Sequence, residues 1–228
     1  HSNYIVLMRK LFPSIVLIAV ASLNVFAQSG RTTGPAEAAT GESDPVPAEK
    51  LFVEASEYAV GAHGWVMALS FFSLAVGCAG LLVVLVPRIK SVAGRIGLVF
   101  MLAAALGLAM ATVFPMDPIT VSPENASFSG KMHGVAAMIG NPGFMIGALL
   151  LGLTLRRSPD WAQVRTPLLA MTALIWISFV FMMVFMISMM QQQGGSPTGG
   201  IGWANRLLWA AYCAWLMLAA WPVAKAPP

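Results

Sequence analysis

Five long apolar runs with almost no charged side chains limit what this chain can fold into. They cover approximately residues 58–86, 96–114, 132–155, 167–190 and 203–221. A helix needs about 20 apolar residues to cross the hydrocarbon core of a bilayer. Lipid offers the backbone no hydrogen-bond partners, so such runs must form helices. The sequence therefore predicts an all-α, polytopic transmembrane helix bundle with five core helices, occupying residues 55–228.

Composition agrees with this fold class. Only 10% of the 228 residues are charged, whereas soluble domains carry roughly a quarter. The formal charge of +4 is no argument for nucleic acid, because basic residues in membrane proteins mainly set orientation. We expect the lipid bilayer as the main partner, together with a lipid or small-molecule ligand or another membrane protein, and no nucleic acid.

The first 54 residues differ from the rest. Arg9 and Lys10 precede an apolar stretch that ends near Ala27. This pattern predicts a signal peptide over residues 1–27, or an uncleaved signal-anchor helix that would make a sixth span. Residues 28–54 are rich in Gly, Pro, Ala and Glu and lack an apolar period. We expect them to form a flexible extracytoplasmic tether.

The thirteen basic residues are divided unequally between the two sides of the predicted bundle. Alternate loops assign nine to one side: Arg9, Lys10, Arg88, Lys90, Arg95, Arg156, Arg157, Arg165 and Lys225. The other four are Arg31, Lys50, Lys131 and Arg206. Cytoplasmic loops are the ones enriched in Lys and Arg. We therefore expect a multi-pass protein of a cell membrane, a bacterial inner membrane, with its C-terminus in the cytoplasm.

The candidate functional residues are polar side chains near the opposite, outer end of the predicted helices. Ionisable groups within membrane spans are costly and are functional candidates. The set comprises His63, Asp117, His133, Asn141, Asn205 and Arg206. Each also has a structural interpretation: an interfacial histidine, a turn-forming aspartate, a packing asparagine or an arginine that reaches the lipid head groups.

We expect these residues to form an outward-facing polar vestibule. Asp117 and His133 flank one short loop, so the buried carboxylate should find its partner among His133, Lys131 and Arg206. Asn141 is followed by Pro142, which should kink its helix and open space for a pocket wall.

Several short motifs resemble one family. They are Phe114-Pro115-Met116-Asp117 at a helix end, His133 opening the next run, and the closing segment Gly202-Trp203-Ala204-Asn205-Arg206-Leu207-Leu208 with Trp215 downstream. Over about residues 55–222 the chain is similar to the integral-membrane family called domain of unknown function 998. The resemblance implies a six-helix membrane protein and draws attention to Asp117, His133 and Arg206. It implies no reaction.

Three functions remain open from the sequence. The first is an integral membrane protein that binds a lipid or small polar ligand in the vestibule. The second is a haem or redox protein, with His63 and His133 as axial ligands. The third is a non-catalytic accessory subunit. We expect no haem cofactor, because His63 should lie about 7 Å deep whereas His133 begins its run near the surface. We expect no metal either, because Asp117 and His133 would need a third ligand and the sequence has no His-x-x-x-His motif.

Overall fold

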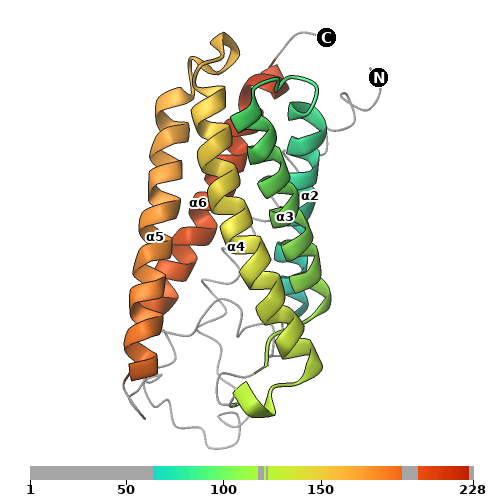
Figure 1. Ribbon diagram of the computed structural model, residues 1–228, viewed down its shortest axis with the longest axis vertical. Coiled ribbons are helices and arrows are strands. Elements are labelled where there is room, and N and C mark those ends of the chain that lie inside the picture. Colours follow the sequence, from blue (N-terminus) through green and yellow to red (C-terminus); the bar gives the residue numbers. More distant parts are fainter. Residues whose placement is uncertain (1–63, 118–120, 122, 192–199, 226–228) are drawn as a thin grey trace, which may run out of the picture.

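The computed structural model describes residues 64–117, 121, 123–191 and 200–225. Five long helices account for nearly all of this part of the chain (Figure 1): α2 (Gly64–Leu85), α3 (Val92–Val113), α4 (Phe128–Leu155), α5 (Arg165–Gln191) and α6 (Gly200–Lys225). All five are long and apolar enough to cross a membrane. The predicted transmembrane helix bundle is confirmed. The predicted signal or anchor segment and the tether lie outside the described residues.

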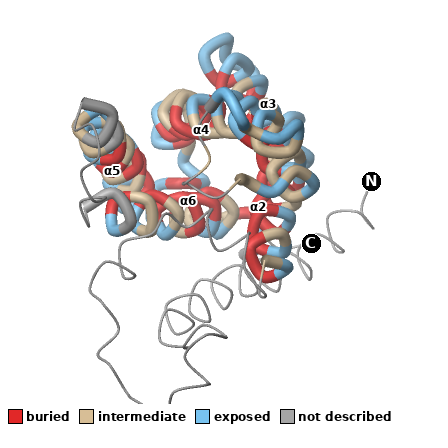
Figure 2. The backbone as a smooth tube through the Cα atoms, turned by 90° about the horizontal axis from the view of Figure 1, so that it is seen from below, coloured by how far each residue is buried: buried red, intermediate tan, exposed pale blue. Residues whose placement is uncertain are grey.

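The five helices run alternately up and down and are arranged in a ring. Each helix packs against its neighbours in the chain, and α6 returns to contact α2. The view along the bundle shows this ring (Figure 2). One end of it, called the basic end below, holds the α2–α3 and α4–α5 connections and the last residue of α6. The opposite end, called the Asp117 end, holds the α3–α4 connection and the starts of α2 and α6.

Two helices begin four residues earlier than the apolar pattern predicts. α3 starts at Val92 and α4 at Phe128, because Ser91 and Ser127 act as N-caps. The Ser91 hydroxyl accepts from the Gly94 N–H at 3.2 Å, and the Ser127 hydroxyl accepts from the Gly130 N–H at 3.0 Å. Capping satisfies a backbone donor that the first turn otherwise leaves unpaired. Hydropathy does not detect such polar first turns.

Glycines let α3 and α4 approach closely. A Cβ atom added to Gly107 would lie 2.6 Å from the Gly140 Cα, and one added to Gly143 would lie 2.8 Å from the Ala104 backbone nitrogen. Backbone therefore packs directly on backbone along this seam, as small residues allow in membrane helices. The two helices act as one wall of the ring.

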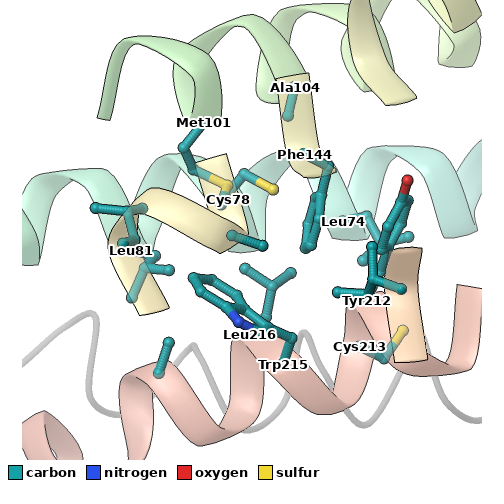
Figure 3. Close-up of a cluster of buried hydrophobic side chains, with 14 of the residues drawn as sticks. Leu74, Cys78, Leu81, Met101, Ala104, Phe144, Tyr212, Cys213, Trp215 and Leu216 are labelled. Carbon is teal, nitrogen blue, oxygen red and sulfur yellow. The ribbon is translucent and has the colours of Figure 1, made fainter. Parts of the chain in front are cut away.

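The half of the bundle nearer the basic end is filled by side chains. Trp215 is fully buried, and its Nε1–H donates to the Thr172 hydroxyl of α5 at 2.9 Å. The Trp161 Nε1–H donates to the Ala219 carbonyl at 2.9 Å and attaches the α4–α5 connection to α6. Cys78 of α2 belongs to the same cluster of buried side chains (Figure 3). This half holds the helices together.

Candidate ligand-binding site

A cavity of about 570 Å³ occupies the half of the bundle nearer the Asp117 end. All five described helices contribute to its wall. Most of the lining is aromatic, methionine or small: Phe71, Gly107, Leu108, Ala111, Met116, Gly130, Gly134, Ala136, Ala137, Met138, Gly140, Pro142, Phe144, Phe179, Met182, Met183 and Trp209. The polar side chains are those of His133, Asn141, Asn205 and Tyr212. Ligand cavities in proteins have this size and this mostly apolar character.

An aromatic pair forms the floor of the cavity. The rings of Phe144 and Tyr212 stack with centroids 3.9 Å apart and planes inclined by 22°. Below them, Phe144 meets Trp215 edge-on at 5.9 Å. The Tyr212 hydroxyl donates to the Asn141 Oδ1 at 3.3 Å, so the asparagine beside Pro142 is held by α6. This layer separates the cavity from the filled half of the bundle.

Asn205 supplies a polar group with unused bonding capacity. Its Nδ2 donates to the Met182 sulfur at 3.5 Å. Its Oδ1 is buried and has no hydrogen-bond partner among the residues that the structure describes. A buried acceptor without a donor costs about 1–3 kcal/mol. A ligand that donates a hydrogen bond to this oxygen would recover that free energy.

His133 lines the cavity and is also tied to the preceding loop. Its ring is 7% exposed, and Nδ1 lies 2.9 Å from the Phe114 carbonyl oxygen. A carbonyl only accepts, so Nδ1 carries a proton, and Nε2 is an acceptor when the ring is neutral. The edge of the ring packs against Phe71 of α2, with centroids 5.9 Å apart. Its orientation is therefore fixed by α2 and by the end of α3.

Asp117 serves the same loop as a capping group. Its Oδ2 accepts from the Ser127 N–H and its Oδ1 from the Ser127 hydroxyl, both at 2.7 Å. The prediction that its partner would be His133, Lys131 or Arg206 is wrong, because the start of α4 presents nearer donors. A carboxylate is also favoured there by the positive end of the helix dipole.

Two further contacts join residues 114–117 to the first turns of α4. We call these contacts, together with those of Asp117, the clasp. The Ser129 hydroxyl donates to the Pro115 carbonyl at 2.9 Å. Gly130 packs against the Asp117 carboxylate so closely that an added Cβ would overlap it. The motif Phe-Pro-Met-Asp followed by His133 thus works as one unit. It positions His133 and Met116 on the cavity wall.

The structure separates the predicted site residues into two groups. His133, Asn141 and Asn205 line the same cavity, whereas Asp117 and Arg206 are not among its lining residues. Arg206 lies with its Cζ 5.7 Å from the centre of the Trp203 ring, which is a cation–π distance. His63 lies outside the described residues.

The expectation that His133 lies nearer the surface than His63 is wrong. His133 does not open its helix: α4 begins five residues earlier at Phe128, about 7.5 Å along the axis. It therefore lies as deep as was expected of His63, so a difference in depth no longer excludes that pair.

The sequence reasoning missed most of the aromatic wall. Trp209 and Tyr212 are four and seven residues after Asn205, which places all three on one face of α6. That spacing around a polar residue was a usable signal. Met182 was not among the predicted site residues, and its contact with Asn205 gives it a defined place in the site.

Residues 54–222 match the family described as protein of unknown function (DUF998). The match covers more than half of the chain, and the protein belongs to this family. No curated protein and no solved structure matches it.

Proposed function

We propose that this family member binds an amphiphilic ligand, a lipid or a small molecule, in the cavity between its helices. The observation that carries the proposal is the combination of an apolar, aromatic cavity of about 570 Å³ with a buried acceptor, Asn205 Oδ1, that has no hydrogen-bond partner in the described part of the chain. Packed helix bundles contain few voids larger than a water molecule. A space of this size, bounded by polar groups of fixed orientation, favours a binding role over a purely structural one.

Ligand co-purification tests this proposal. The full chain is purified in mild detergent, and native mass spectrometry measures bound small molecules. Ala137→Phe adds a ring to the cavity wall, whereas Val135→Phe adds the same ring to an exposed position of α4 that does not line the cavity. We expect a bound adduct in the parent chain and in Val135→Phe, and its loss in Ala137→Phe. Equal adducts in all three chains, or none in any, would contradict the proposal.

We also propose that the basic end faces the cytoplasm of a bacterial cell and that the Asp117 end faces outward. The unequal distribution of Lys and Arg supports this orientation. Glu124 and Asp160 are exposed acidic residues at opposite ends of the bundle. The substitutions Glu124→Cys and Asp160→Cys therefore form a matched pair. A membrane-impermeant maleimide added to intact cells should label the first and spare the second, and the reverse pattern would overturn the orientation.

A redox protein is the second candidate, favoured by the neutral-ring Nε2 of His133 beside a cavity that also holds methionines. Imidazole nitrogen and methionine sulfur are both haem ligands. A visible spectrum of the purified chain decides this point. A Soret band that disappears in His133→Ala would promote the redox function, and a chain without visible absorbance would leave the ligand-binding function as the proposal.

A further inference from the structure

The polar groups on the cavity wall include both acceptors and a donor. Asn205 Oδ1 has no partner among the described residues, and His133, with a proton on Nδ1 that faces the Phe114 carbonyl, presents Nε2 as an acceptor when its ring is neutral. The indole Nε1–H of Trp209 is a donor on the same wall. The Tyr212 hydroxyl and the Nδ2 of Asn205 already donate to protein atoms. A matching ligand group therefore both donates and accepts, as a hydroxyl does, whereas a quinone or an ester carbonyl only accepts.

The cavity wall also provides nothing to neutralise a charge. No Asp, Glu, Lys or Arg side chain is among the described residues that line it. Moving an ionised head group into such surroundings is costly unless an opposite charge meets it. The ligand that fits is uncharged, and its donor is a hydroxyl group.

The opening of the cavity points toward the bilayer. Near the basic end α4 and α5 are in contact, where Gly152 meets Thr172. From there the two helices diverge toward the Asp117 end (Figures 1 and 2). Gly134, Met138 and Pro142 of α4 line the cavity and are nevertheless exposed, Met138 by 79%. We call these three residues, with Phe179 and Met183 of α5, the portal.

The portal lies at hydrocarbon depth. Gly134 and Pro142 are six and fourteen residues after Phe128, so they lie about 9 and 21 Å along a helix of about 42 Å. The hydrocarbon core extends about 15 Å to either side of its middle. A molecule that reaches this opening is therefore already dissolved in the membrane.

From this geometry we infer that the ligand is a neutral lipid with a free hydroxyl group, such as a diacylglycerol or a long-chain alcohol, and that it enters sideways through the portal. This inference rests on the proposed function, because it assigns a ligand class to the same cavity. The hydroxyl donates to Asn205 Oδ1 once the amide rotates toward the cavity, because that oxygen is buried against protein in this structure. The hydrocarbon chains lie against the aromatic and methionine wall and pass out between α4 and α5.

Three photoactivatable lipids with the same diazirine-bearing chains test the class. They are a diacylglycerol, its methyl ether at the free hydroxyl, and a phosphatidylcholine, each presented to the full chain in nanodiscs. Mass spectrometry locates labelled peptides of α4 and α6. Diacylglycerol should label the cavity wall saturably, with an apparent affinity about tenfold above that of the ether, as expected for one buried hydrogen bond. Equal or stronger labelling by the ether or the phosphatidylcholine would overturn the ligand class.

Two variants separate the parts of the inference. Asn205→Leu removes the acceptor and should lower diacylglycerol labelling to the level of the ether. Gly134→Leu adds a side chain at the portal, at a position where none of the described residues lies within 4 Å of an added Cβ. It should slow labelling by each lipid that labels the parent cavity, and an unchanged rate would exclude sideways entry. If none of the three lipids labels the cavity saturably, the neutral-lipid class fails, whereas the proposed function fails only if the co-purification experiment finds no adduct that Ala137→Phe removes.

Discussion

The two halves of this bundle are built from the same five helices and are used differently. In the half near the basic end, α4 and α5 touch and Trp215 fills the space between α5 and α6. In the half near the Asp117 end, the same helices diverge around a cavity of about 570 Å³. The stacked rings of Phe144 and Tyr212 divide the two.

The difference shows how a small membrane protein can be both stable and open. Lipid tails are as apolar as the helices, so association depends on close packing and a few hydrogen bonds. Here the buried tryptophan bonds lie in the half near the basic end, and the closest backbone packing lies along the α3–α4 seam. The other half is held by the clasp of Asp117 and Ser127 and by the bonds Tyr212–Asn141 and Asn205–Met182 on the cavity wall, which leave its interior free.

The largest expected effect lies in the packed half. Trp215→Ala removes a fully buried side chain and its bond to Thr172. We expect the free energy of unfolding to fall by about 4 kcal/mol, the usual cost of deleting a buried large aromatic side chain. Met138→Ala, at the exposed portal, should change it by less than about 0.5 kcal/mol. Unfolding in mixed detergent micelles measures both, and equal losses would remove the distinction between the halves.

The α3–α4 seam should be nearly as sensitive. Gly107→Leu drives a side chain into the Gly140 backbone, which cannot move aside as a flexible side chain can. We expect a loss of about 3 kcal/mol. In Gly134→Ala, on the same helix pair, the new methyl group meets none of the described residues. Because alanine favours a helix more than glycine does, this substitution should stabilise the chain by up to about 1 kcal/mol. An unchanged free energy of unfolding in Gly107→Leu would contradict the close backbone packing of α3 on α4.

The clasp should contribute less. Asp117→Ala leaves the Ser127 N–H without its acceptor and loses a charge-assisted bond. The expected loss is about 2 kcal/mol, together with weaker ligand binding because His133 loses its fixed position. Calorimetry of unfolding and the photolabelling assay report the two effects. Unchanged ligand binding in a folded Asp117→Ala chain would show that the clasp does not position the site.

The smallest effect compares the two N-caps. Ser91→Ala and Ser127→Ala each remove a cap and should each cost about 1 kcal/mol. Only Ser127→Ala should also weaken lipid labelling, because Ser127 belongs to the clasp and Ser91 lies at the opposite end. Equal effects on labelling would show that ligand binding depends on the overall stability of the protein and not on the local structure of the cavity.

The sequence was sufficient for the fold because one physical constraint dominates it. Twenty uncharged apolar residues have few alternatives to a membrane helix, so all five spans were predicted. The starts of α3 and α4 were not predicted, because Ser91 and Ser127 act through single hydrogen bonds that hydropathy cannot detect.

The site was predicted only in part. His133, Asn141 and Asn205 were chosen because polar groups are costly in membranes, and all three line the cavity. Asp117 was expected to pair with a cation, yet its partner Ser127 is a neutral residue in the loop ahead of the third run. The divergence of α4 and α5 arises from packing between distant residues such as Gly152 and Thr172, which no local pattern contains.

The account depends most on the cavity being a lipid site. An electron cryomicroscopy map of the full chain, purified from membranes into nanodiscs, tests this directly. We predict an elongated non-protein density above Phe144 and Tyr212 that reaches Asn205 and leaves the bundle between α4 and α5, and that is absent from Ala137→Phe. A map in which α4 and α5 close on each other and protein side chains fill the space would contradict the account.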